Sequence, residues 1–433
     1  MRQWLAVMAV CVQLGCVGVP GGIDSGVFIT VDSGTPAGRD AGAQGPLDAG
    51  TTSVVDAGKT ADAGRGTRFD GGVISPRLAG LADNTGLDLG KFTCTDPDGS
   101  DNCARVTDYS GLVYDSNAHQ LLMFGGGHAT TMTDTVFAFD LTTSLAWREL
   151  YLPTPCAKMI SSNLDTPTGA WKSGTSGPYP RPLAAHTYDL LAFAPVQNEF
   201  VMISRLFNGG YCSTVGNDVG GPVAHFDLDA QTWSFTTAHP VGGSTIDASE
   251  LDPVSGKVLI FGGQGLGFYD LTTRLFTLNV DALNGGTLKT SQGGTADLSA
   301  LGYANDLVYF PPTDTFYYFA RGSPVVTYAL KLNRANLTAS TLDRVTTTGP
   351  TSDHQNPGYS YDSLNQIIGG GIENDHIFIF EPPTNTWASH AINGGSPGTQ
   401  AFLAIGYDPV NNVFVFVNDY ASGQHTWAYR YKN

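Results

Sequence analysis

The chain has 433 residues and a formal net charge of −17 at pH 7, because 39 acidic residues outnumber 22 lysines and arginines. A chain this acidic lacks the positive charge that attracts nucleic acid or anionic lipid, so neither is an expected partner. The low charged fraction of 14%, with 54 glycines, 18 tyrosines and 22 phenylalanines, favours a β-rich fold with an aromatic surface, on which sugars stack.

The first 16 residues have the form of a signal peptide. Arg2 precedes the apolar run at 4–12, and Leu14, Gly15 and Cys16 follow. This ending resembles a bacterial lipobox, in which the cysteine is lipidated, although Gln13 occupies a position where leucine is usual. A membrane-spanning helix needs ~20 apolar residues. The sequence therefore predicts an exported protein, secreted or anchored to the outer membrane through a lipid on Cys16, with plain cleavage nearby as the alternative.

Residues 17–70 differ sharply in composition from the rest. Asp-Ala-Gly recurs at Asp40, Asp48, Asp56 and Asp62, among Ser, Thr, Pro and Gly. Such a segment cannot bury enough apolar surface to offset its ordering entropy, so we expect a disordered linker.

Residues 71–433 contain an internal repeat. Each copy has a short apolar strand, a polar turn of Asp, Pro, Asn or Gly, and a second strand rich in β-branched and aromatic residues. The six copies lie at 111–127, 191–203, 251–263, 308–319, 359–371 and 405–417. Most are followed by a third strand that ends in an aromatic-acid pair, then a turn and a further aromatic. These pairs and aromatics are Phe139-Asp140 with Trp147, Phe226-Asp227 with Trp233, Tyr269-Asp270 with Phe276, and Phe380-Glu381 with Trp387.

Four strands per repeat, with Gly-Gly after the second strand and an aromatic in the fourth, resemble the blades of a kelch-type β-propeller related to galactose oxidase. The resemblance covers most of residues 105–433. It implies an all-β ring of six four-stranded blades, in which each fourth-strand aromatic packs between neighbouring blades.

Two repeats depart from this pattern. The fourth has Ala320, Arg321 and Gly322 in place of Gly-Gly and no clear aromatic ending, and the last stops after three strands. An unpaired edge strand is a liability, so we expect the amino-terminal piece at 72–78 to supply the missing strand and close the ring. Seven blades remain possible if residues 75–110 contain a degenerate unit.

The cysteines beyond the signal region are Cys94, Cys103, Cys156 and Cys212. An exported protein meets an oxidising compartment, so we expect disulfides, with Cys94–Cys103 and Cys156–Cys212 favoured among three pairings. Acidic residues at 96–101 offer carboxylates to calcium, but the spacing lacks the distal Glu of a calcium loop, and a solvated turn is favoured. No cofactor is firmly predicted, and a structural metal ion remains possible.

Histidines occupy equivalent loops of the repeats. His128 follows the glycines of the first repeat, His186 and Tyr188 precede the second, and Asp353, His354 and Tyr359 lie at the start of the fifth. These loops open on one face of a propeller, so the residues are candidates for a single binding site. The alternative is that each histidine bonds a loop carbonyl and pins a blade junction.

The resemblance to kelch-type propellers implies three classes of function. Propeller polysaccharide lyases act by β-elimination on uronate-containing glycans, and in that class His128, His186 and Tyr188 would act as acid and base. The residues that would hold the uronate carboxylate are Arg181, Arg205 or Arg321. Copper radical oxidases need a cysteine cross-linked to tyrosine, for which Cys212 beside Tyr211 is the one candidate. The third class binds an extracellular polysaccharide or protein without catalysis. We favour this class, with a carbohydrate polymer as ligand.

Overall fold

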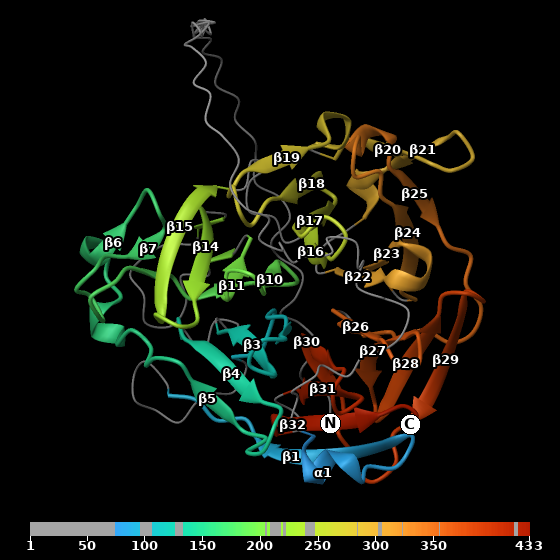
Figure 1. Ribbon diagram of the computed structural model, residues 1–433, viewed down its shortest axis with the longest axis horizontal. Coiled ribbons are helices and arrows are strands. Elements are labelled where there is room, and N and C mark those ends of the chain that lie inside the picture. Colours follow the sequence, from blue (N-terminus) through green and yellow to red (C-terminus); the bar gives the residue numbers. More distant parts are fainter. Residues whose placement is uncertain are drawn as a thin grey trace, which may run out of the picture. The chain divides into compact units, whose positions relative to one another are not determined.

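The computed structural model describes residues 74–95, 106–125, 133–203, 206–207, 218–219, 222–238, 247–283, 285–301, 305–322, 324–354, 356–419 and 423–433. Nearly all regular structure in these residues is β, as predicted, in several antiparallel sheets around a common centre, which is consistent with a β-propeller (Figure 1). The signal peptide and linker predicted at 1–70, including Cys16, lie outside the described residues.

Each of the predicted repeats falls largely on the first two strands of one sheet. We number these sheets in chain order, and their strands run from the inside outward. The first three sheets consist of β2 (Val113–Asp115), β3 (Gln120–Phe124), β4 (Val136–Asp140) and β5 (Trp147–Glu149); β10 (Leu191–Ala194), β11 (Glu199–Met202), β14 (Pro222–Asp227) and β15 (Thr232–Ala238); and β16 (Asp247–Asp252), β17 (Lys257–Gly262), β18 (Gly265–Tyr269) and β19 (Phe276–Leu278).

The other three sheets continue the series. They consist of β22 (Asp306–Phe310), β23 (Thr315–Ala320), β24 (Val326–Lys331) and β25 (Thr341–Arg344); β26 (Tyr359–Asp362), β27 (Ile367–Glu373), β28 (His376–Glu381) and β29 (Thr386–Ala391); and β30 (Gln400–Asp408), β31 (Val413–Asn418) and β32 (His425–Arg430), completed by β1 (Thr85–Lys91). The first strand of each sheet contacts the first strand of the next, and β30 contacts β2, so the innermost strands form a closed circle.

Short elements fill the connections. The fourth sheet is extended by β20 (Thr287–Lys289) and β21 (Thr295–Asp297), which the sequence pattern did not predict. Two small sheets come from the chain between β5 and β14. They are made of β6 (Leu164–Asp165), β7 (Ala170–Trp171) and β8 (Arg181–Pro182), and of β9 (Ala185–His186), β12 (Leu206–Phe207) and β13 (Asp218–Val219). The helical turns are α1 (Pro76–Ala79), η1 (Cys156–Lys158), η2 (Ser161–Asn163), η3 (Val280–Ala282), η4 (Leu298–Ala300), η5 (Pro311–Thr313) and η6 (Leu337–Ala339). No helix in the described part of the chain is long and apolar enough to cross a membrane.

The missing outer strand of the sixth sheet does come from the amino-terminal part of the chain, but the predicted segment was wrong. Within 72–78, Pro76 begins the short helix α1, and the strand that pairs with β32 is β1, in the register Thr85 to Arg430 (Figure 1). Proline lacks the backbone N–H that a ladder needs and is favoured at the first turn of a helix. The described part of 75–110 holds only α1 and β1, not a seventh sheet.

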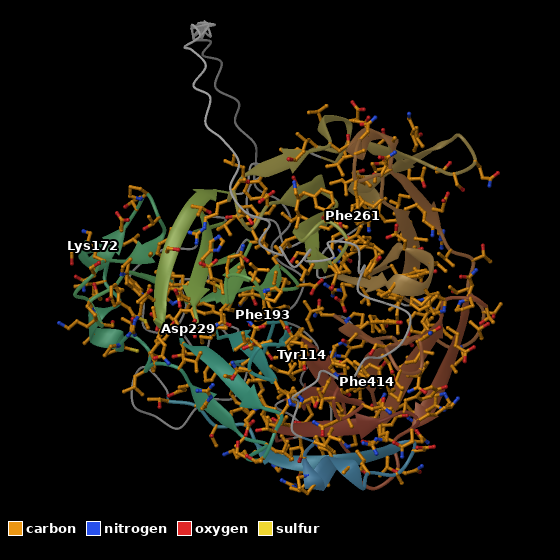
Figure 2. The ribbon with its side chains drawn as sticks, in the orientation of Figure 1. Tyr114, Lys172, Phe193, Asp229, Phe261 and Phe414 are labelled. Atoms are coloured by element: carbon orange, nitrogen blue, oxygen red, sulfur yellow. The ribbon has the colours of Figure 1, made fainter. Side chains whose placement is uncertain are left out.

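A hydrophobic cluster joins each sheet to the next. Phe193, Phe261 and Phe414, labelled in Figure 2, belong to the clusters between the first and second, third and fourth, and fifth and sixth sheets. Outer-strand tryptophans pack across these junctions as predicted: Trp233 lies 5.6 Å from Phe124, and Trp387 lies 5.7 Å from Phe319, between ring centroids. Burial of apolar surface between the sheets is therefore what holds the ring together.

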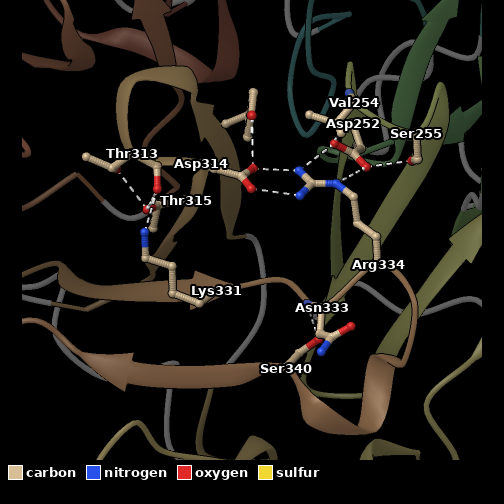
Figure 3. A network of polar contacts seen from close by, with 11 residues as sticks. Asp252, Val254, Ser255, Thr313, Asp314, Thr315, Lys331, Asn333, Arg334 and Ser340 are labelled. Carbon is tan, nitrogen blue, oxygen red and sulfur yellow. Dashed lines mark hydrogen bonds and ion pairs between the residues drawn. The ribbon is translucent and has the colours of Figure 1, made fainter.

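Charged side chains add to one of these junctions. Arg334 reaches from the loop after β24 to Asp252 of the third sheet, with bonds of 2.8 and 2.9 Å, and to Asp314 of the fourth, with bonds of 2.8 and 2.6 Å (Figure 3). Asp252 is fully buried, and the planar guanidinium matches both carboxylates in two-pronged fashion. This contact fixes the third sheet against the fourth.

Candidate functional site

The loops that lead into the innermost strands gather the polar and aromatic side chains of interest. We call them the leading loops. They precede β2, β10, β16, β22, β26 and β30, and the one before β16 lies outside the described residues. Because these strands form the inner circle of the ring, their first residues meet around its centre at one end (Figure 1).

Five ring side chains form a continuous series, which we call the aromatic array; four come from the loops before β2, β10 and β26, and Phe402 lies at the start of β30. The ring of Tyr109 lies 4.3 Å from Phe402, 4.8 Å from His186 and 5.6 Å from Tyr188, between centroids. The series extends from Phe402 to His354, at 6.3 Å. Two of the predicted leading-loop histidines and Tyr188 are thus brought together, linked by Tyr109 and Phe402.

The backbone of the array is strained. Three of its bulky residues have left-handed φ angles: 60° at Tyr109, 49° at Tyr188 and 46° at Phe402. For a side chain of this size such a conformation costs about 1–3 kcal/mol and persists only where neighbouring structure imposes it. Hydrogen bonds impose it on the first two, since the amide of Tyr188 donates to the carbonyl of Tyr109 at 2.7 Å.

Gly111 is required next to this contact. Its amide donates to the carbonyl of Tyr188 at 2.9 Å, and a Cβ at this position would lie 2.8 Å from the same oxygen. Only glycine lets the first leading loop approach the second this closely. Strained residues of this kind concentrate at binding sites, where the geometry of the side chains matters more than the stability of the loop.

The members of the array differ in exposure. His186 and Tyr188 are only 4% and 6% exposed, whereas Tyr109, Phe402 and His354 are half-buried. The ring surface open to a ligand therefore belongs mainly to the last three, and His186 and Tyr188 support it from beneath.

His354 has a structural role that its bonds define. Its Nε2 lies 3.0 Å from the carbonyl of Gln400, and its Nδ1 accepts from the amide of Asn356 at 3.2 Å. These partners require the neutral ring with the proton on Nε2, and burial lowers the pKa of His354 in agreement. His354 thus pins the fifth leading loop to the sixth, as one of the sequence interpretations proposed.

Two other predicted binding residues lie near His354: Asp353 in the same loop and Tyr359 at the start of β26. Tyr359 is a core residue, 4% exposed, whose ring packs against Phe319 at 4.5 Å and Trp387 at 5.5 Å. Asp353 is exposed, and its amide donates to Glu373 at 3.0 Å. Of this pair, only Asp353 presents its side chain at the surface.

Three carboxyl side chains of neighbouring inner strands interact with one another, and we call them the axial carboxyls: Asp189 before β10, Glu250 in β16 and Asp306 in β22. Asp189 follows Tyr188 directly. Its Oδ2 accepts from the amide of Leu307 at 3.0 Å, and Oδ1 of Asp306 accepts from the same amide at 2.9 Å. Asp306 also accepts from the amide of Tyr359. The second, fourth and fifth sheets are therefore tied together at the centre of the ring by a pair of adjacent carboxyls.

Burial and mutual repulsion keep protons on this group. Burial, and then the negative charge of Asp306, raise the pKa of Asp189 well above its usual range and that of Glu250 to about 8. Burial raises the pKa of Asp306 itself to about 6. Asp189 and Asp306 lie close enough to share a proton, which is the usual state of paired carboxyls.

Several buried polar atoms of the leading loops have no hydrogen-bond partner among the described residues. They are the hydroxyls of Ser110, Thr187 and Tyr359 and the side-chain oxygen of Asn356. Buried polar groups almost always have partners, so atoms of this kind mark places where water or a ligand hydroxyl bonds. Within the described residues no cluster of His, Cys, Asp or Glu has the arrangement of a metal site.

The arginines predicted for a uronate carboxylate are separated. Arg181 donates to the carbonyl of Leu152 at 2.7 Å and lies 4.3 Å above the ring of Tyr151, in contacts between the first and second sheets. Arg321 follows β23 at the leading-loop end, where its amide donates to Asn305 at 2.8 Å. His128 and Arg205 lie outside the described residues.

Two of the four cysteines in the predicted disulfides, Cys94 and Cys156, lie in the described part of the chain. Cys94 and Cys156 are each disulfide-bonded. Their predicted partners, Cys103 and Cys212, lie outside the described residues, as do the carboxylates at 96–101, so the pairing stays a prediction.

The sequence interpretation missed Tyr109, Phe402 and the axial carboxyls. A signal was present, because Tyr109 and Tyr188 each lie beside an aspartate, just ahead of an inner strand. Comparison of the residues that precede each repeat, in addition to the repeats themselves, would have found both.

No family model and no curated protein sequence matches the chain. Solved structures that resemble it include an auxiliary nutrient binding protein of Bacteroides thetaiotaomicron, at 10% identity and a TM-score of 0.42 over 82% of this chain and 74% of that one. They also include a gluconolactonase of Xanthomonas campestris, at 12% identity and a TM-score of 0.41 over 79% and 88%. A Bacteroides thetaiotaomicron protein of unknown function has 11% identity and a TM-score of 0.44 over 79% and 75%. Likeness at this level carries no inference about function.

Proposed function

We propose that the chain is an exported kelch-type β-propeller of six blades, which binds an extracellular carbohydrate polymer through the aromatic array and does not catalyse a reaction. In this proposal residues 1–16 direct export, Cys16 carries the lipid that anchors the protein to the outer membrane, and residues 17–70 act as a spacer. The four cysteines form the pairs Cys94–Cys103 and Cys156–Cys212. The closed circle of inner strands supports the blade count.

The observation that carries the binding proposal is the aromatic array itself. Tyr109 and Phe402 are half-buried, their rings lie 4.3 Å apart, and both have strained backbones. An apolar core does not need strained loops to place its rings, whereas a sugar-stacking surface needs rings fixed at its edge.

Binding is favoured over catalysis by the exposure of the candidate acid and base. A polysaccharide lyase must bring both groups to one sugar ring, but His186 and Tyr188 are almost fully buried beneath Tyr109. Arg181 is engaged by the carbonyl of Leu152 and the ring of Tyr151. This burial and these contacts support binding over catalysis.

Electrophoresis through gels that contain single polysaccharides tests the proposal. We expect the purified protein to be retarded by at least one polymer. Tyr109→Asn and Phe402→Asn should each weaken the affinity that this retardation reports about tenfold, which corresponds to a loss of ~1.4 kcal/mol of binding free energy. Asparagine tolerates the left-handed backbone, so these variants remove the ring without straining the loop.

The control is Tyr179→Asn, which removes a tyrosine that is 53% exposed and lies outside the array. Equal retardation of the wild type, both array variants and the control would show that the array does not bind the polymer.

A lyase acting on a uronate-containing glycan is the second candidate, because His186 and Tyr188 lie side by side with ring centroids 5.9 Å apart. β-Elimination leaves an unsaturated uronate that absorbs in the ultraviolet. Absorbance that rises on mixing with an acidic polysaccharide, and that His186→Ala abolishes, would establish the lyase and overturn the binding proposal.

A further inference from the structure

The sixth inner strand, β30, is interrupted where it reaches the aromatic array. Gln400 of β30 pairs with Asn418 of β31, and Ile405 pairs with Phe416. Four residues, 401–404, lie between these two pairs on β30, against one residue on β31. We call residues 401–404 the β30 bulge. Over their described residues, the five other inner strands pair with their neighbours in unbroken register, so the bulge is a feature of β30 and not of the repeat.

The β30 bulge brings adjacent side chains to two leading loops. The ring of Phe402 lies 4.3 Å from that of Tyr109, between centroids, and Leu403 packs against Tyr188. Bulges occur preferentially beside functional sites, where they re-aim a side chain. The extra residues of the bulge are therefore what β30 contributes to the array.

Gln400 begins the bulge and is fully buried. Its Nε2 donates to the carbonyl of Phe402 at 2.6 Å, and its Oε1 accepts from the amide of Ile372 in β27 at 3.3 Å. Because one partner is an acceptor and the other a donor, they fix the direction of the side-chain amide. The backbone carbonyl of Gln400 also accepts from Nε2 of His354 at 3.0 Å. One residue thus holds two members of the array relative to the fifth sheet.

The bond from Gln400 accounts for the left-handed backbone of Phe402. The φ of 46° is one that a phenylalanine disfavours, so neighbouring structure must impose it. The side chain of Gln400 holds the carbonyl of this same residue and is held in turn by Ile372. The fifth leading loop leaves room for it, because a Cβ at Gly358 would lie 2.7 Å from Nε2 of Gln400.

We propose that Gln400 is the positioning residue of the aromatic array: its bond to the carbonyl of Phe402 holds the β30 bulge in the conformation that presents the Phe402 ring beside Tyr109. Gln400 is buried and acts through Phe402, without touching the ligand. This inference rests on the proposed binding function and adds to it the residue through which the fifth and sixth sheets shape the binding surface.

Adsorption of the purified protein to insoluble cellulose, chitin and xylan measures the effect on binding. Gln400→Met keeps the length of the side chain but removes the donor to Phe402. We expect it to bind about tenfold more weakly than the wild type to each of these polymers that adsorbs the wild type. Gln400→Asn has an amide too short to reach both Phe402 and Ile372, should bind as weakly, and takes the place of Gln400→Met if that variant does not fold.

A rescue and a control separate positioning from general stability. At pH 4 burial keeps the carboxyl of Gln400→Glu protonated, so it can donate to Phe402 and this variant should bind like the wild type. Asn411→Leu removes a buried amide side chain at the other end of the same inner strand, where it bonds Ser75 and Leu141. It should lower stability and leave adsorption unchanged.

Crystal structures of the wild type and of Gln400→Met give a readout that needs no polysaccharide. Without the bond from Gln400, Phe402 should leave the left-handed region, and its ring should move away from that of Tyr109. A Phe402 unchanged in the variant would overturn the inference.

The adsorption results separate the inference from the proposed function. Wild-type adsorption by Gln400→Met, equal losses in Gln400→Met and Asn411→Leu, or weak binding by Gln400→Glu at pH 4 would each overturn the role of Gln400 while the binding function stands. If the wild type adsorbs to none of the three polymers, this counts against the proposed function, and the crystal structures still decide whether Gln400 positions Phe402.

Discussion

Arg430 anchors the amino-terminal segment that completes the sixth sheet. Its side chain is buried, 3% exposed, and no carboxylate of the described residues is bonded to it. Instead the guanidinium donates to the carbonyls of Leu78 at 2.9 Å, Leu81 at 2.7 Å and Asn411 at 2.7 Å. One side chain therefore bonds carbonyls within and just after α1 and fixes them to the last sheet.

Arg430→Met should destabilise the ring substantially. Three buried carbonyls would each lose a bond to the guanidinium at about 1 kcal/mol, which gives a loss of about 3 kcal/mol in the free energy of unfolding. In a chain of this size each kcal/mol lowers the thermal midpoint by roughly 2 °C. We therefore expect the midpoint, followed by near-ultraviolet circular dichroism, to decrease by about 6 °C.

The matched control is Arg344→Met, an exposed arginine of β25, for which we expect a change within about 0.5 kcal/mol. If the two variants melted at the same temperature, the reasoning that Arg430 closes the ring would be refuted.

Three further predictions concern groups inside the ring. Folding raises the pKa of Glu250 from 4.5 to about 8. The protonated carboxyl therefore contributes fully to stability below pH 4.5, and this contribution is lost as the pH rises to 8. Thermal melts across this range should show a smaller decline of the midpoint in Glu250→Gln than in the wild type. Arg334→Met should lower the free energy of unfolding by about 2 kcal/mol, because Asp252 stays buried without its partner. Urea unfolding measures this, and a loss smaller than that of the exposed control Arg344→Met would contradict the prediction. Tyr269→Phe should cost about 1 kcal/mol in the same assay, because the phenol bonds His225 at 2.7 Å and Thr236 at 3.0 Å; no measurable loss would mean that these bonds do not stabilise the fold.

The local part of the fold could be predicted from the sequence. Strand-turn-strand repeats depend on neighbouring residues, and the expected aromatic-acid pairs do end the third strands, as at Phe139-Asp140 of β4 and Phe380-Glu381 of β28. Such features follow from the alternation of side chains and from turn chemistry within about ten residues.

The closing strand could not be placed in this way. β1 contains Gly86 and Gly90, which lower its intrinsic strand propensity, and it forms because β32, more than 300 residues later, offers a free edge. Pairing over that distance leaves no local signal, so the pattern selected the more apolar segment before it.

The candidate site was only half predictable for a related reason. His186, Tyr188 and His354 were found because equivalent loops of a propeller meet at one end. Tyr109 and Phe402 join them through left-handed backbones that their residue types disfavour, and only the closed ring brings residues 109, 188 and 402 together.

Hydrogen exchange of the protein with and without a bound glycan tests the central claim most directly. If the aromatic array is the binding site, a retarding polymer should slow exchange of the amides at 106–111, 185–189 and 400–403, and Phe402→Asn should abolish this protection. The turns at 195–198, 311–314 and 409–412, at the other end of the inner strands, should be unaffected. Protection confined to those turns, with none in the leading loops, would contradict the account.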